Sequence, residues 1–199
     1  MLKADELQVQ GLDAVSFSLN GGECIAIRGP SGSGKSLLLR AIADLDPNEG
    51  RVFLDTAERG AMSGPLWRRQ VGYVPADPGW WDDRVGDHFA DWNAAIPLLT
   101  RLGLGAEAKD WPISRLSTGE RMRFALVRAL LVKPKVLLLD EPTAPLDAKL
   151  AGSFETLIAE ELRKGLSVLW VTHDAAQAAR VSSRCLVLDN GRVREMAPS

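Results

Sequence analysis

The sequence predicts an α/β protein with a mainly parallel sheet, an N-terminal antiparallel β subdomain and an inserted helical subdomain. Short apolar runs alternate with helix-forming stretches, as in parallel sheets whose strands are joined by crossover helices. A glycine-rich segment lies between an apolar run and a helical stretch, and a later apolar run ends in two adjacent carboxylates. Together these observations favour an open sheet that binds a ligand at the carboxyl ends of its strands.

The first part of the chain alternates short β-like runs with turn signals. Runs at 7–10, 15–19 and 24–28 predict strands, and Asn20-Gly21-Gly22 predicts the turn between the last two. A helix is expected over 36–45, followed by an edge strand over 51–55.

The middle of the chain, about 76–132, loses strand character and gains helix formers, with proline and glycine between them. We interpret it as a helical subdomain inserted into a catalytic α/β core made of about 1–75 and 133–199. In the second part of that core we expect strands over 136–140, 167–172 and 185–189, with helices over 149–164 and from about 175.

The composition indicates one globular domain that needs no metal or disulfide for its stability, with 46% hydrophobic residues in 199. The 24 Lys and Arg residues nearly balance the 26 Asp and Glu residues, and no basic block marks a nucleic-acid site. Cys24 and Cys185 lie in separate apolar runs, which predicts free buried thiols and a reducing cytoplasm. Neither a signal peptide nor an apolar stretch of about 20 residues is found, so any membrane role is expected to come through a partner.

The strongest motif is a phosphate loop between the 24–28 run and the expected helix. It fits G-x-x-x-x-G-K-[ST] with the residues Gly29-Pro30-Ser31-Gly32-Ser33-Gly34-Lys35-Ser36. Glycines let successive N–H groups turn toward phosphates, and the following helix adds its positive N-terminal end. We expect Lys35 to neutralise the β- and γ-phosphates and Ser36 to bind Mg²⁺.

A second motif is the apolar run 136–139, which ends in Asp140 and Glu141. Strands of a parallel sheet bring their carboxyl ends to one edge, so this pair should lie beside the phosphate loop. We expect Asp140 to orient Mg²⁺ through its water shell and Glu141 to polarise an attacking water. An exposed turn with two solvated acids is the alternative interpretation of the pair taken alone.

A third motif, Leu116-Ser117-Thr118-Gly119-Glu120, precedes a long helical stretch. Ser117 and Glu120 have the spacing of a capping box, which explains the two residues without any function. The order of the motifs along the chain favours a functional role for this segment as well. The chain resembles ABC transporter ATPases in the order of five motifs: the phosphate loop, this segment, the acidic pair, Leu146-Asp147 and Thr172-His173-Asp174.

The resemblance covers nearly the whole chain and implies a RecA-like core that works as a head-to-tail dimer around two Mg-ATP. It implies that the signature residues of one copy cap the γ-phosphate held by the other copy: Ser117, Thr118, Gly119 and Glu120. By the same resemblance Asp147 spans the dimer seam, and His173 contacts the γ-phosphate and holds Glu141. The other partner implied is an integral membrane permease, with this chain on the cytoplasmic face of the membrane.

Two positions depart from the family pattern. Ala76, followed by Asp77, stands where the resemblance places a glutamine that reaches the metal and the attacking water. A methyl group cannot make those hydrogen bonds, which predicts slow or altered hydrolysis. Leu12 is followed directly by Asp13, without the usual segment that carries an aromatic ring for the adenine, which predicts loose base selectivity.

Trp80 and Trp81 follow this region, where the family forms a groove for a helix of the permease. Aromatic side chains dominate many interfaces, yet they are equally common in protein cores, so both interpretations stay open.

Three other functions compete with the transporter. A non-transport cassette would carry tandem domains, coiled coils or basic arms, and a small-molecule kinase would not need 116–120 or His173. A regulatory module that binds ATP with weak hydrolysis is consistent with Ala76. Some segments are similar to small bacterial cassettes for metal export, notably of iron. This local similarity does not identify the cargo, the direction of transport or the permease.

Overall fold

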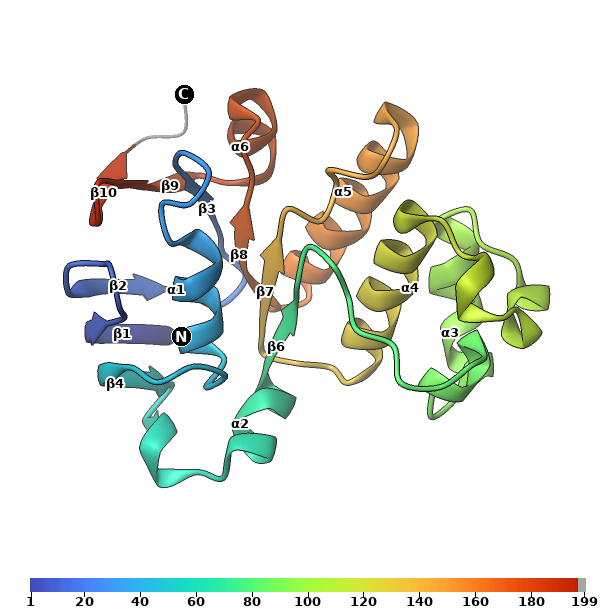
Figure 1. Cartoon of the computed structure of the whole chain (residues 1–199), viewed down its shortest axis with the longest axis horizontal. Helices are drawn as coiled ribbons and strands as arrows, with labels where there is room; N and C mark the ends of the chain where they lie inside the picture. Colours follow the sequence, from blue (N-terminus) through green and yellow to red (C-terminus); the bar gives the residue numbers. More distant parts are fainter. Residues whose placement is uncertain (197–199) are drawn as a thin grey trace.

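The computed structural model describes residues 1–196 and contains a six-stranded, mainly parallel sheet (Figure 1). Its spatial order is β10-β9-β3-β8-β7-β6, and only β10 runs antiparallel to its neighbour. The strands are β3 (Cys24–Arg28), β6 (Val71–Val74), β7 (Val136–Asp140), β8 (Ser167–Val171), β9 (Arg184–Asp189) and β10 (Arg192–Met196). The predicted mainly parallel sheet is therefore confirmed.

A second, antiparallel sheet has the order β2-β1-β4-β5. Its strands are β1 (Leu2–Gln8), β2 (Val15–Leu19), β4 (Glu49–Leu54) and β5 (Ala57–Glu58). The predicted strand over 7–10 is wrong in position, because the alternation that buries Leu2, Ala4 and Leu7 begins five residues earlier. The strand predicted over 51–55 is present as β4, but its predicted edge position is wrong, since β4 lies between β1 and the two-residue β5.

Six α-helices accompany the sheets in the described part of the chain. They are α1 (Lys35–Ile42), α2 (Gly64–Gln70), α3 (Trp92–Arg101), α4 (Thr118–Leu131), α5 (Ala148–Arg163) and α6 (Ala175–Val181). The predicted helix over 36–45 ends earlier, at Ile42, because Asp44 adopts a left-handed backbone with φ 59°. Neither α2 nor β6 was predicted, since each is short and lacks a clear apolar period.

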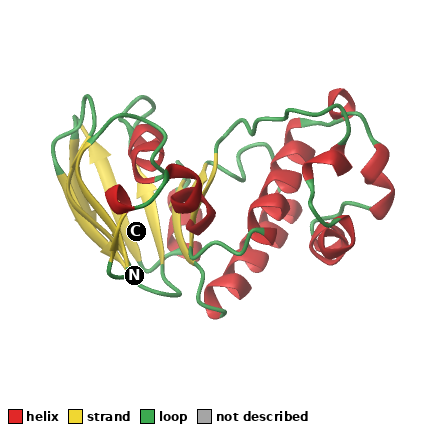
Figure 2. Cartoon of the chain, turned by 90° about the horizontal axis from the view of Figure 1, so that it is seen from below, coloured by secondary structure: helices red, strands yellow, loops and turns green. Residues whose placement is uncertain are grey.

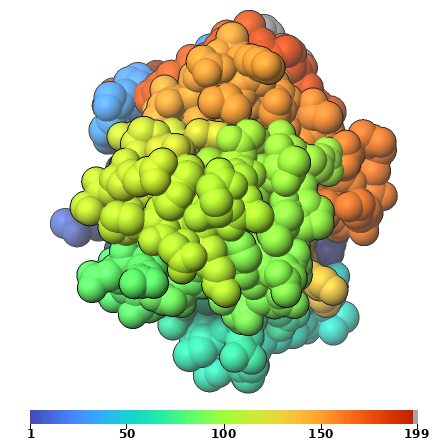
Figure 3. All heavy atoms as spheres, turned by 90° about the vertical axis from the view of Figure 1, so that its right-hand side faces the viewer, coloured from blue at the N-terminus to red at the C-terminus, as the bar shows by residue number. Residues whose placement is uncertain are grey.

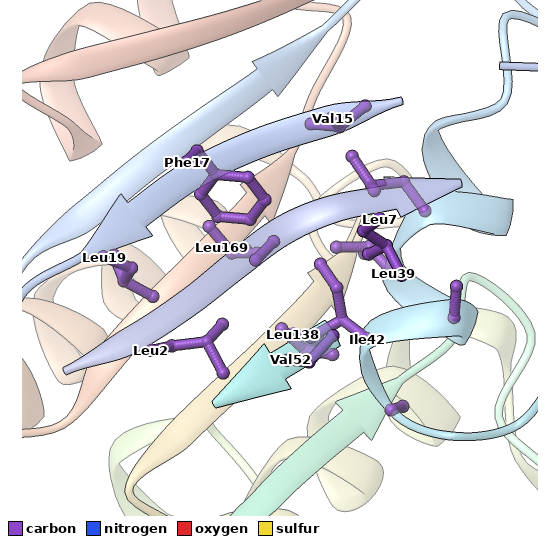
Figure 4. Packing of buried hydrophobic residues seen from close by; sticks show 14 of the residues in the cluster. Leu2, Leu7, Val15, Phe17, Leu19, Leu39, Ile42, Val52, Leu138 and Leu169 are labelled. Carbon is purple, nitrogen blue, oxygen red and sulfur yellow. The ribbon is translucent and has the colours of Figure 1, made fainter. Parts of the chain in front are cut away.

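The core lies on both faces of the main sheet. Val136 and Leu138 of β7 point toward α1 and the antiparallel sheet, whereas Leu137 and Leu139 point toward α4 and α5. Figure 4 shows the first of these clusters, where Leu138 and Leu169 of the main sheet meet side chains of β1, β2, β4 and α1. This arrangement explains why the β7 run is continuously apolar rather than alternating.

Helices α3 and α4 lie at one end of the molecule, with short 3₁₀ helices around them (Figures 1 and 2). These are η2 (Val85–His88), η3 (Ala106–Asp110) and η4 (Ile113–Arg115); a further one, η1 (Arg59–Ala61), precedes α2. Figure 3 views this end face-on, with its green and yellow-green atoms covering the centre. We propose that this end, about 76–132, is the helical subdomain, and that about 1–75 and 133–199 form the catalytic core.

Three aromatic rings pack together inside that end. Phe89 meets Trp92 at 5.1 Å between ring centroids, and Phe124 of α4 lies 6.4 Å from each of them. Phe89 makes edge-to-face contacts with both other rings, and the tilted contact between Trp92 and Phe124 joins α3 to α4. None of the helices in 1–196 has the length and apolar character needed to cross a bilayer.

Candidate nucleotide site

The predicted phosphate loop joins β3 to α1, and two of its glycines are required by geometry. Gly29 has a φ of 150°, and a Cβ there would lie 2.2 Å from the carbonyl oxygen of Leu188. Gly34 caps α1 with a φ of 99°, and a Cβ there would overlap the side chain of Leu12. The backbone therefore has the tight, left-handed turns that aim N–H groups into a phosphate-sized cradle.

Lys35 is drawn back into this cradle. Its Nζ donates to the carbonyl oxygens of Gly29 at 2.9 Å and Pro30 at 2.8 Å, and the side chain is only 6% exposed. Burial lowers the pKa of Lys35, while the charges of Glu141 and Asp140 act to raise it. The ammonium is thus held within the electrostatic reach of both carboxylates, as the motif predicted.

Other members of the motif lie around the cradle. Ser36, in the first turn of α1, is exposed, and so are Pro30, Ser31 and Gly32. Ser33 has a buried hydroxyl without a hydrogen-bond partner among the described residues. An unsatisfied hydroxyl inside a loop of N–H groups suits a site that receives oxygen atoms from a ligand.

The two predicted carboxylates stand at the carboxyl end of β7. Asp140 is 4% exposed and accepts a hydrogen bond from the hydroxyl of Tyr73 at 3.1 Å. Glu141 has a φ of 50°, an uncommon backbone conformation for a residue other than glycine, and its N–H donates to the carbonyl of Val171 at 3.1 Å. This bend separates the two side chains, so that one is buried and the other reaches outward.

His173 contacts Glu141 directly, through its Nε2 and the carboxylate Oε1. The histidine follows β8, the neighbour of β7, and Thr172 donates its N–H to the carbonyl of Ile27 in β3 at 3.1 Å. The strand ends that carry the loop, the acids and the histidine therefore meet at one edge. The structure brings together Lys35, Asp140, Glu141 and His173, as the sequence predicted.

The segment Ser117–Glu120 is not hydrogen-bonded to this cradle within residues 1–196. Ser117 caps α4, accepting from the N–H of Glu120 at 3.2 Å, while Glu120 accepts from the N–H of Ser117 at 2.9 Å. Ser117 and Thr118 are exposed, and a Cβ on Gly119 would lie 3.0 Å from the carbonyl of Pro145. The capping-box interpretation is thus confirmed, and the cap remains open to solvent.

Asp147 lies beside this helix start in the same chain. Its carboxylate caps α5 by accepting from the N–H of Leu150 at 2.9 Å, and its side chain is exposed. The close approach of Gly119 to Pro145 and Leu146 brings the start of α4 next to the segment that precedes Asp147. The structure provides this local explanation for Asp147, while its place at a dimer seam stays a prediction.

Sequence reasoning missed two groups of residues around the site. Tyr73 was not singled out, although it is the one tyrosine of the sequence and lies near the strand end that carries Ala76. The second is a hydrogen-bonded network between the loop after β7 and helices α5 and α6, in which Gln177 is buried. It consists of Thr143, Glu155, Gln177 and Arg180. No sequence signal linked these four, because they are brought together from three elements.

The two departures from the family pattern are visible in the structure. Ala76 and Asp77 are exposed in the segment that follows β6. Leu12 is buried and packs under Gly34 in the loop that precedes β2, where it fills the space beside the cradle. Tyr73 lies in β6, before Ala76. Burial raises the pKa of Tyr73, and the charge of Asp140 and the hydrogen bond to it act in the same direction.

A separate groove of about 850 Å³ runs between β6 and the helical end. Trp81 lines it and is 68% exposed, whereas Trp80 is half-buried and packs into the helical core. The guanidinium of Arg128 contacts both rings, 4.8 Å from the centroid of Trp80 and 4.7 Å from that of Trp81. The two tryptophans thus have different environments, one in the core and one on a surface.

Comparison with known proteins agrees with this arrangement. A family model described as ABC transporter matches residues 12–144. The aliphatic sulfonates import ATP-binding protein SsuB 2 of Paracoccus denitrificans (strain Pd 1222) is 36% identical, over 94% of this chain and 75% of the relative. A probable sulfate/thiosulfate import ATP-binding protein CysA of Chlorella vulgaris is 33% identical, over 92% of this chain and 83% of the relative.

Solved structures show the same fold. An ATP-binding subunit of an ABC transporter superposes with a TM-score of 0.89 at 25% identity, covering 98% of this chain and 89% of that one. A dimeric ATP-binding cassette in a post-hydrolysis state with ADP and Pi gives a TM-score of 0.81 at 25% identity, covering 100% and 99%. The chain belongs to the ABC transporter family. It is an ATP-binding, ATP-hydrolysing cassette of that family.

Proposed function

We propose that this chain hydrolyses Mg-ATP between two of its copies and drives a membrane permease, from the cytoplasmic face of the membrane. The observation that carries the proposal is the meeting of Lys35, Asp140, Glu141 and His173 at one sheet edge beside the glycine cradle. The cradle and Lys35 bind the triphosphate, and phosphate oxygens replace the carbonyls that Lys35 now contacts. Nucleotide binding thus releases the lysine from its own loop.

The donors at the cradle fit magnesium. Ser36 and Asp140 offer a hydroxyl and a carboxylate, and the ion prefers a few such oxygens together with phosphates and waters. Within residues 1–196 no three acidic, histidine or cysteine side chains gather into a metal cluster, so most ligands would come from nucleotide and water. When bound, the ion neutralises charge on the β- and γ-phosphates.

Glu141 and His173 perform the chemistry on the protein side. The Glu141 carboxylate accepts the proton of the attacking water, and His173, in contact with that carboxylate, holds its orientation. Asp140 is buried, whereas the backbone bend at Glu141 directs the Glu141 carboxylate outward. Glu141 therefore serves as the base, and Asp140 serves the metal.

The open cap at Ser117 is the reason to expect two copies. A helix start favours an anion, and here the Glu120 carboxylate of the same chain occupies part of the cap while Ser117 and Thr118 stay exposed to a further anion. The γ-phosphate of the ATP held by the second copy would complete this anion site. Gly119, Glu120 and Asp147 would line the interface between the two copies. A relative of the same fold is dimeric with ADP and Pi, which supports this arrangement.

The groove with Trp81 is the proposed contact with the permease. Its wall contains residues 72–75 of β6 and the following turn, residues of α4, and the exposed Leu45 and Val132, so it suits an apolar helix of the partner. Trp81→Ala should weaken permease binding at least tenfold, as loss of a buried aromatic anchor does, without loss of folding. Trp80→Ala is the contrast, because its half-buried ring should affect thermal stability first. Equal permease binding by wild type and Trp81→Ala would refute the docking site.

The direction of transport is proposed to be import, since the two relatives described above are import proteins for sulfonates and for sulfate/thiosulfate. The names of these two relatives do not mention metal export. The similarity to metal-export cassettes therefore stays a prediction. Identifying the permease that co-purifies with the chain tests both the direction and the cargo.

The enzymatic proposal is tested by phosphate release from the purified chain. Wild type should hydrolyse ATP only with Mg²⁺, and Lys35→Ala should lose nucleotide binding. Light scattering after size-exclusion chromatography should show dimers with Mg-ATP when hydrolysis is blocked. A chain that binds no nucleotide, or that stays monomeric in every nucleotide state, would contradict the proposal; binding with negligible turnover would favour the regulatory alternative that Ala76 suggests.

A further inference from the structure

The hydroxyl of Tyr73 is the one side-chain hydrogen-bond partner of Asp140 within residues 1–196. Its Oη donates to Oδ2 of Asp140 at 3.1 Å. The two residues come from neighbouring parallel strands, and Tyr73 is aligned with Leu138, so its side chain reaches two residues further along β7. The contact therefore runs forward along the sheet to the edge where the cradle lies.

The Asp140 carboxylate is almost completely removed from solvent, at 4% exposure. A buried carboxylate needs hydrogen-bond donors to satisfy its oxygens and to keep one orientation. Tyr73 occupies Oδ2, which leaves Oδ1 for the water shell of a metal ion. Lys35 contributes charge at longer range and is hydrogen-bonded to Gly29 and Pro30 rather than to Asp140.

Tyr73 is itself held in place by packing. Its ring is partly buried against the cluster that contains Val136 and Leu138 of β7. The charged pair of Arg40 and Asp46 lies close enough to influence it electrostatically from the side of α1. The hydroxyl is thus aimed at Asp140 by a side chain with little freedom to rotate.

We propose that Tyr73 is a positioning residue for Mg²⁺, which fixes the Asp140 carboxylate through Oδ2 so that its other oxygen faces the metal. The inference rests on the proposed function, because it assumes that Mg-ATP binds at the cradle. It adds a residue outside the predicted motifs to the machinery. Ala76, whose methyl group makes no hydrogen bond, cannot take this role.

The test is Tyr73→Phe in the full chain, which removes one oxygen atom and keeps the ring. The thermal unfolding temperature is measured with ATP and EDTA, and then with ATP and increasing Mg²⁺. Wild type and variant should be stabilised equally by ATP in EDTA. The variant should need about tenfold more Mg²⁺ for half of the additional stabilisation, as expected for loss of one hydrogen bond to a charged group.

Two controls separate positioning from loss of stability. Val74→Ala weakens packing on the same strand without touching a hydrogen bond, and it should leave the Mg²⁺ requirement unchanged. In an Asp140→Asn background, Tyr73→Phe should have no further effect on the Mg²⁺ requirement, since the two changes act through one contact.

An unchanged Mg²⁺ requirement in Tyr73→Phe overturns the inference and leaves the proposed function intact. The same conclusion follows if Tyr73→Phe raises the requirement equally in the Asp140→Asn background, or if Val74→Ala raises it as much. A wild-type chain that is not stabilised by Mg-ATP overturns the inference together with the proposed function.

Discussion

The Nε2 atom of His173 contacts the Glu141 carboxylate across the ends of the adjacent strands β8 and β7. Both side chains are partly exposed, so the pair faces the space beside the cradle rather than the core. An attacking water in that space would meet a carboxylate whose orientation is already set.

Glu141→Gln keeps the shape of the side chain and removes its capacity to accept a proton. Phosphate release should fall by about 10²–10⁴-fold, the usual contribution of a general base, while Mg-ATP binding persists. Because the γ-phosphate remains intact, dimers should accumulate in size-exclusion chromatography. His173→Ala is the companion variant and should also slow hydrolysis without loss of binding. Wild-type turnover in Glu141→Gln would remove the glutamate from the mechanism.

Gly29→Ala tests the geometry of the cradle. The new methyl group would overlap the backbone carbonyl of Leu188, which cannot rotate away, and the φ of 150° is unfavourable for alanine. We expect a loss of more than about 2 kcal/mol in the free energy of unfolding, together with loss of ATP binding.

Gly152→Ala is the matched control, because nothing lies within 4 Å of a Cβ at that position of α5. There the substitution should stabilise the chain by about 0.5–1 kcal/mol, as alanine replaces glycine inside a helix. Urea unfolding of both variants provides the comparison. Equal stability of the two variants would show that the close approach at Gly29 is not rigid.

Gln177→Leu tests the hydrogen-bonded network behind the site. Gln177 donates to Thr143 and Glu155 at 2.8 Å each, and Glu155 also pairs with Arg180 at 2.9 Å. Removing the buried amide takes the side-chain partner from the Thr143 hydroxyl and one donor from Glu155, which should reduce the free energy of unfolding by about 1–3 kcal/mol. The exposed Gln10→Leu should stay within about 0.5 kcal/mol of wild type. Equal effects of both substitutions would argue against the network.

Cys24 should be unreactive in the folded chain. Burial, and to a lesser extent the charge of Glu23, raises the pKa of Cys24 from 9.0 to about 12, and burial also raises the pKa of Cys185. A disulfide reagent at pH 8 should label neither thiol quickly until denaturant is added.

The sign of the pH dependence follows from the direction of the Cys24 shift. The folded thiol stays protonated while the unfolded one ionises above its pKa of 9.0, so its contribution to stability is complete below pH 9 and is lost as the pH rises toward 12. Urea unfolding of wild type and Cys24→Ala at pH 7, 9 and 10.5 measures this loss. Rapid labelling of the native chain at pH 8 would contradict the burial.

Ala76→Gln tests the departure from the family pattern. An amide at this exposed position could reach the metal and the attacking water, as a methyl group cannot, so turnover should rise. Steady-state phosphate release is measured with and without the permease. Equal turnover of variant and wild type in both conditions would show that the position has no effect on hydrolysis.

Much of the fold was predictable because its signals are local. The continuous apolar runs of β3, β7 and β8 and the glycines of the cradle depend on residues that are close in the chain. Strand β1 was misplaced and β4 was wrongly expected at an edge, because their pairing is made over long separations, as Leu2 with Leu54 illustrates. The short α2 and β6 have too few residues for a period to appear.

The residue types of the site were determined by the sequence alone. A lysine after a glycine loop, two acids after a buried strand and a histidine after the next strand already specify phosphate chemistry. Their meeting at one edge follows from parallel strands, which the alternation of apolar runs and helices predicted.

Only the tertiary structure decided which partners those side chains have. It joined Tyr73 to Asp140 and Gln177 to Thr143, and it separated the half-buried Trp80 from the exposed Trp81. The two hydrogen bonds connect residues that lie far apart in the chain. The two tryptophans are adjacent in the chain and differ only in the direction of their side chains. The physical reason is that a hydrogen bond or a buried face depends on the packing of several elements at once, which no local pattern of residues encodes.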